Sequence, residues 1–108
     1  MKIINNVTNE NYIQWIEKFV ADVLKAAKLS YEEVVIEDIE PSRRIYLTID
    51  SKEYSLRTWN YHPVDTDSDG KPCAEMVQYT LYEMVTDNDG GSHGEEVDFG
   101  LIKIEWKN

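Results

Sequence analysis

The chain has 108 residues, which suits one hydrophobic core, and we expect a single domain over residues 1–108. Its 21 acids against 11 bases give a formal net charge of −10, which argues against nucleic acid or an anionic membrane as a direct partner. No apolar run approaches the roughly 18 residues of a membrane span, and the start of the chain lacks the apolar region of a signal peptide. The single cysteine, Cys73, fits a reducing compartment, so we expect a cytoplasmic protein.

Residues 8–28 have the pattern of one amphipathic helix. Thr8 is suited to cap the first turn, because its hydroxyl can accept a bond from an unpaired backbone amide. Apolar residues then recur at spacings of three and four, at Tyr12, Ile16, Phe19, Val20, Val23 and Ala27. Lys25 and Lys28 suit the negative end of the helix dipole, so the sequence predicts a helix of about five turns that ends near them.

After Tyr31 the apolar period changes to two, which is the period of a strand with one buried face. The alternating runs predict strands over residues 34–39, 44–50, 54–62, 73–86 and 97–106. We expect a tight turn at Ser51 and Lys52, an interruption of the strand at Pro63, and a bulge at Gly100.

The links between these strands are too short for parallel crossovers, so neighbours should pair antiparallel. The predicted fold class is α+β, with the N-terminal amphipathic helix packed on a curled antiparallel meander sheet of about five strands. The sheet face beneath the helix should hold Ile45, Leu47, Ile49, Leu56, Val77, Tyr79 and Leu81. The opposite face is left open, and we expect function there.

Negative charge is concentrated in one third of the chain. Between residues 65 and 98, ten carboxylates stand against one base, Lys71, which gives this segment a formal charge of −9. Such a field attracts basic protein surfaces, including those that hold nucleic acid. We expect one concentrated acidic patch that steers association and fills a basic site, formed by Asp65, Asp67, Asp69, Asp87, Asp89, Glu95, Glu96 and Asp98.

The run from Asp65 to Gly70 resembles the first half of a calcium loop of the EF-hand type, because its carboxylates alternate and end at a glycine. Asp65, Asp67 and Asp69 are therefore candidate ligands of a weakly bound calcium ion. The twelfth loop position, a glutamate in that family, is Met76 here. A plain acidic hairpin turn is the alternative interpretation.

Arg57, Trp59 and Tyr61 are predicted to share one face of the strand 54–62. Aromatic side chains beside an arginine are typical of protein interfaces, since they supply large contact area with few rotors to freeze. We expect a partner protein or a second copy of the chain to cover this face. An ordinary exposed sheet face is the alternative.

Candidate catalytic groups are limited to Cys73, His62, His93 and Asp65. A cysteine nucleophile needs a base within reach and prefers a positive environment, whereas Cys73 follows three aspartates. The histidine and cysteine spacings do not match a zinc site. We therefore do not expect an enzyme.

These features predict a small acidic inhibitor that occupies a basic, nucleic-acid-binding surface of a larger protein. In size and charge the chain resembles the phage-encoded inhibitors of bacterial defence, such as anti-CRISPR proteins that imitate DNA; the resemblance covers no particular residues. Two alternatives stay open: a calcium-dependent binding module, and an immunity protein that neutralises a toxic nuclease.

Overall fold

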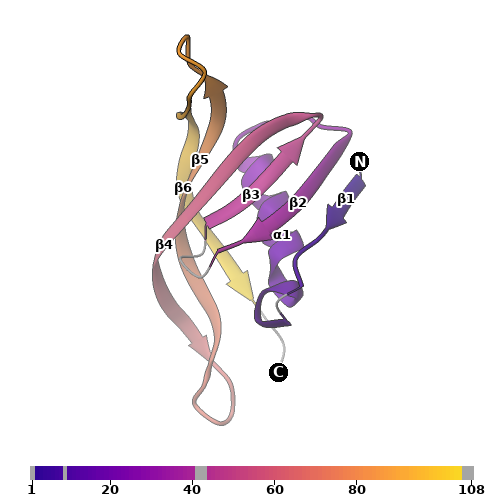
Figure 1. The fold of residues 1–108 in the computed structure, drawn as a ribbon. Coiled ribbons are helices and arrows are strands. Elements are labelled where there is room, and N and C mark those ends of the chain that lie inside the picture. Colours follow the sequence, from indigo (N-terminus) through magenta and orange to yellow (C-terminus); the bar gives the residue numbers. More distant parts are fainter. Residues whose placement is uncertain (1, 9, 41–43, 106–108) are drawn as a thin grey trace.

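The computed structural model describes residues 2–8, 10–40 and 44–105 (Figure 1). It contains, in chain order, β1 (Lys2–Asn5), α1 (Glu10–Ala26), β2 (Glu33–Ile39), β3 (Arg44–Ile49), β4 (Lys52–Thr66), β5 (Pro72–Thr86) and β6 (Ser92–Glu105). The six strands form one sheet in the order β1-β2-β3-β4-β5-β6. The predicted α+β class, with one N-terminal helix on a curled and mostly antiparallel sheet, is confirmed.

The strand β1 was not predicted. It pairs parallel with β2, with Ile3 opposite Val34, so α1 also serves as the crossover between two parallel neighbours. The expectation of antiparallel pairing alone is therefore wrong at this edge, while β2 to β6 pair antiparallel throughout. Four residues are too few for an alternating pattern to identify a strand from sequence.

One face of α1 closes the core against the sheet. The apolar helix residues Ile16, Phe19, Val20, Val23 and Leu24 are fully buried, and Trp15 is nearly so. All seven sheet residues predicted to lie beneath the helix are buried as well. The predicted contact of Tyr12 lies outside the described side chains. Apolar residues spaced three and four apart on the helix therefore pack against apolar residues spaced two apart on the strands, and together they form a single core.

The hairpin between β3 and β4 has a two-residue turn, Asp50 and Ser51, because Ile49 pairs with Lys52. The turn was predicted one residue too late. Both turn residues have positive φ, 47° and 71°, as a turn that follows the right-handed strand twist requires. The Asp50 carboxylate accepts the backbone N–H of Glu33 at 2.9 Å, which ties the turn to β2.

The structure differs from two predicted irregularities of the strands. β4 continues through Pro63, which pairs with Glu75, because register shifts on either side accommodate the proline. In β6, Asp98 pairs with Leu81 and Glu96 with Tyr82, so the intervening residue 97 forms the bulge. The predicted bulge at residue 100 is wrong. That glycine lies in register opposite Tyr79, and its missing side chain leaves room for the Tyr79 ring.

The strands β4, β5 and β6 have 14 to 15 residues each, and their ends project beyond the part of the sheet that α1 covers (Figure 1). The molecule is therefore elongated, with extents of 54 × 26 × 26 Å. The turn between β4 and β5 and the turn between β5 and β6 lie at opposite ends of it (Figure 1). We call them the β4–β5 tip (residues 65–71) and the β5–β6 tip (residues 87–96).

Candidate interaction surface

The acidic residues form two groups, not the single concentrated patch that was predicted. Asp65, Asp67 and Asp69 lie at the β4–β5 tip, whereas Asp87 and Asp89 lie at the β5–β6 tip. All of β5 separates the two tips, and at about 3.3 Å per residue this distance is about 45 Å. One small basic pocket therefore cannot contact both groups at once.

At the β4–β5 tip the carboxylates bond mainly to the backbone of their own turn. The Asp67 carboxylate accepts the backbone N–H of Asp69 at 2.9 Å and that of Lys71 at 3.0 Å, and Asp65 accepts the N–H of Thr66. Gly70 has a φ of +78°, which suits a tight turn. Among the described residues, no three His, Cys, Asp or Glu side chains are grouped as a metal site would need. This geometry matches the acidic hairpin turn more closely than a calcium loop.

The β5–β6 tip holds a histidine between two carboxylates. The Nδ1 atom of His93 contacts Asp87, and its Nε2 atom lies 3.4 Å from Glu95. The bond to Asp87 is the main reason that the pKa of His93 is raised, and Glu95 adds to the effect. The charge of this tip therefore depends on pH, while Asp89 and Glu96 remain exposed carboxylates beside it.

Asp98 differs from the other predicted acids, because it lies toward the inner side of the sheet. Its carboxylate accepts the hydroxyl of the buried Tyr79 at 3.0 Å. Burial and this carboxylate raise the pKa of Tyr79 to about 12. Asp98 thus connects β6 to the core, a role that its position in an acidic run does not reveal.

On the face opposite α1, which we call the outer face, β6 exposes a row of apolar side chains. The fractional exposure of Val97 is 38%, that of Phe99 68% and that of Leu101 55%. We call these three residues the apolar stripe. Across β5, Gln78 pairs with both Trp59 and Leu101, so a shallow hollow runs from Trp59 on β4 to the stripe on β6.

The predicted aromatic face is only partly present. The guanidinium carbon of Arg57 lies 5.6 Å from the centre of the Trp59 ring, which is the geometry of a cation–π contact. Tyr61, in contrast, bonds to the hydroxyl of the buried Thr58 and packs against the core. A register shift that begins after Trp59 causes this difference, so the prediction that Tyr61 shares the outer face is wrong.

The stripe itself was not named as a candidate site. Its signal is present in the sequence, because Val97, Phe99 and Leu101 alternate with residues that turn inward. The sequence indicated a shift in this alternation but assigned the wrong residue to the bulge, and the face of each side chain depends on that position.

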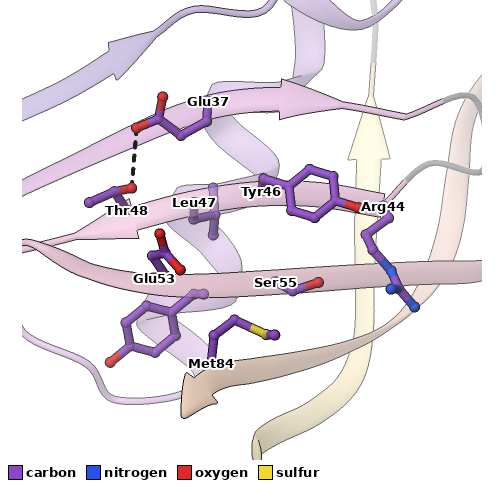
Figure 2. Close-up of a pocket in the computed structure, with 9 residues that line it drawn as sticks. Glu37, Arg44, Tyr46, Leu47, Thr48, Glu53, Ser55 and Met84 are labelled. Atoms are coloured by element: carbon purple, nitrogen blue, oxygen red, sulfur yellow. Dashed lines mark hydrogen bonds between the residues drawn. The ribbon is translucent and has the colours of Figure 1, made fainter. Parts of the chain in front are cut away.

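A second hollow, of about 280 Å³, lies on the outer face between β3, β4 and β5 (Figure 2). Its lining includes Arg44, Tyr46, Thr48 and Met84. The hydroxyls of Tyr46 and Thr48 are already engaged, since Tyr46 donates to Glu40 and Thr48 donates to Glu37 at 3.1 Å. The hollow therefore offers a ligand the guanidinium of Arg44 beside the carboxylates of Glu37 and Glu53, with Leu47 and Met84 as its apolar wall.

The structure places Asp65 beside Cys73, opposite Ala74, but does not bring Cys73 and His93 together. Cys73 begins β5 and His93 follows its far end, so the whole strand separates them. Desolvation, followed by the carboxylates of Asp65 and Asp67, raises the pKa of the Cys73 thiol, as its acidic surroundings predicted. His62 lies on β4 opposite Met76 and is exposed. The raised pKa disfavours the thiolate form of Cys73.

No protein-family model matches the sequence, and no curated protein or solved structure shows significant similarity to it. Among the described residues, the single helix is too short and too polar to cross a membrane.

Proposed function

We propose that the protein is a small acidic binding protein that docks its outer face, across β4 to β6, on a basic surface of a larger protein. The observation that carries this proposal is the exposed apolar stripe with an acidic tip beyond each end. The stripe supplies apolar contact area, and the tips supply charge that speeds encounter with a cationic surface. The chain acts by covering the basic surface of the partner, and this mechanism requires no chemical reaction.

The separation of the tips favours a partner that handles nucleic acid. A spacing of about 45 Å corresponds to about 13 base pairs of duplex, because each base pair rises 3.4 Å. Basic surfaces of that length are typical of proteins that follow a phosphate backbone. A protein docked along such a surface would exclude nucleic acid from it, which is the mechanism of a DNA-mimicking inhibitor.

A defence nuclease and a toxic nuclease both present such a surface, so inhibition of bacterial defence and immunity to a toxin follow from the same chemistry. The calcium-dependent module is not proposed, because the Asp67 carboxylate already bonds two amides of its own turn.

The test is charge reversal at the tips with a matched control. Asp69→Lys combined with Glu96→Lys changes one exposed acid at each tip. Glu17→Lys combined with Glu32→Lys changes the overall charge equally at exposed positions of α1 and of the segment before β2. In pull-downs from bacterial lysate at low and high salt, the tip variant should lose the partners that the control retains. Recovery of the same partners by both variants at both salt concentrations would refute the electrostatic mechanism.

A further inference from the structure

The strand β6 forms one edge of the sheet, where α1 contacts it but no further described strand is added. It pairs with β5 along 13 residue pairs, and among the described strands no other pairs with it. Backbone N–H and C=O groups on an open edge can bond an added strand. The opposite edge of the sheet is β1, which has only four residues. The long open edge therefore coincides with the strand that carries the apolar stripe.

The side chains of β6 are arranged in three parts. Glu95 and Glu96 lie near its start, at the acidic β5–β6 tip, and the apolar stripe occupies its middle. Glu105 lies at the end of β6 and forms a salt bridge of 2.9 Å with Lys103, the one lysine of this strand. Asp65 of the β4–β5 tip pairs with Ala74, which pairs with Glu105, so this tip lies beside the end of β6 with β5 between them. The edge thus has an acidic tip near each end and is apolar between them, while Glu105 itself is neutralised by Lys103.

From this arrangement we infer that the open edge of β6 accepts an extended segment of the partner as an added strand. Charge complementarity requires basic residues at both ends of that segment and alternating apolar residues in its middle. The inference rests on the proposed function, because the segment belongs to the basic partner proposed above.

A second copy of the chain is the less suitable occupant. In either orientation of two paired β6 strands, acidic ends would lie opposite acidic ends. Each copy would also bring a net charge of −10 to the interface. Like charges that face each other across paired strands are destabilising. A strand with basic residues at both ends would instead place opposite charges across from the acidic ends of β6.

The probe is a peptide with the sequence Lys-Lys-Thr-Val-Thr-Ile-Thr-Val-Thr-Lys-Lys. Its control has the same middle and glutamates in place of the lysines. Calorimetry of the full chain should show saturable binding of the lysine peptide and affinity for the control weaker by about tenfold or more. Amide hydrogen exchange followed by NMR should slow along β6 and remain unchanged along β1.

Two variants test whether the stripe takes part. Phe99→Ser combined with Leu101→Ser should weaken peptide binding by about tenfold. Val64→Ser removes another exposed apolar side chain, with a fractional exposure of 49% on β4, and should leave binding unchanged. Circular dichroism checks that all variants remain folded.

The outcomes separate this inference from the proposed function. If the lysine peptide leaves exchange along β6 unchanged while the tip variant still loses its cellular partners, strand addition is overturned and the proposed function stands. Equal binding of the lysine and glutamate peptides also overturns it, as does a dimer in sedimentation whose β6 amides are already protected. If the tip variant and its control keep the same partners, the proposed function fails whatever the peptide does.

Discussion

Tyr79 is the residue that joins the helix, the sheet and the open strand. Its ring meets the Phe19 ring edge-on, with the centroids 6.5 Å apart, and is only 2% exposed. Its hydroxyl donates to Asp98 at 3.0 Å, and the ring also covers Gly100. Both contacts on β6 flank Phe99, so Tyr79 holds the segment of β6 that presents the apolar stripe.

Replacing Tyr79 with phenylalanine removes the hydroxyl and keeps the ring. A hydrogen bond to a charged group contributes about 1.5–3 kcal/mol, and the half-buried Asp98 can recover part of this from water. We therefore expect Tyr79→Phe to lower the free energy of unfolding by about 1–2 kcal/mol at neutral pH.

The burial of Tyr79, together with the same bond, predicts a pH dependence. The pKa of Tyr79 rises from 10.0 to about 12 in the folded state, so the folded protein holds this proton more tightly than the unfolded chain does. The stabilisation is fully present below pH 10 and is lost as the pH rises toward 12. Two pKa units correspond to about 2.7 kcal/mol, which is enough to remove the advantage of the natural residue over phenylalanine.

Urea unfolding followed by tryptophan fluorescence measures both effects, at neutral pH and in steps above pH 9. Tyr82→Phe, on the half-exposed outer side of β5, is the matched control and should change little. The proposed role of the Tyr79 hydroxyl is refuted if Tyr79→Phe is as stable as the natural protein at neutral pH, or if the difference in stability between them is the same at pH 11 as at pH 7.

Three further predictions concern the β5–β6 tip and the two faces of the sheet. Gly90→Ala should cost about 1–2 kcal/mol in thermal unfolding, because its φ of +89° strains any residue with a Cβ atom even where space is open. In an NMR titration the pKa of His93 should lie above 6.5 and fall in Asp87→Asn; its stabilising effect is present below pH 6.5 and is lost as the pH rises through the raised pKa. Phe99→Ser should change the free energy of unfolding by less than about 0.5 kcal/mol, whereas Phe19→Ala should lower it by about 3–5 kcal/mol.

For each of these predictions, a specific result would contradict it. Equal thermal midpoints for Gly90→Ala and the natural chain would show that the turn tolerates a side chain. The same His93 titration in Asp87→Asn would show that the contact is not formed in solution. A large loss of stability in Phe99→Ser would place its ring inside a packed cluster and remove it from the apolar stripe.

The helix and the buried sheet face could be predicted because their periodicity is strong. Ile16, Phe19, Val20 and Val23 recur at helical spacing, and all four are fully buried. The strand 73–86 was predicted almost to its observed bounds. That strand already implied that the acidic loops on its two sides lie at opposite ends, since a strand of this length is extended throughout.

The candidate surface could be predicted only in part, because it depends on register. A shift of one residue moves every following side chain to the other face of a strand. One such shift places Tyr61 against the core, and the bulge at Val97 decides that Phe99 and Leu101 face outward. Register is set by the partner strand, which the alternation within a single segment does not contain.

A long open edge beside exposed apolar side chains is ordinarily a site of uncontrolled association. In β6 two features limit this risk: the bulge at Val97 interrupts the regular edge, and carboxylates near both ends repel another copy of the same strand. Neither feature covers Phe99 or Leu101, which remain available to a strand of opposite charge. The charges that would oppose pairing of β6 with another copy are therefore the same charges that would select a cationic partner, so both effects would have one physical origin in this fold.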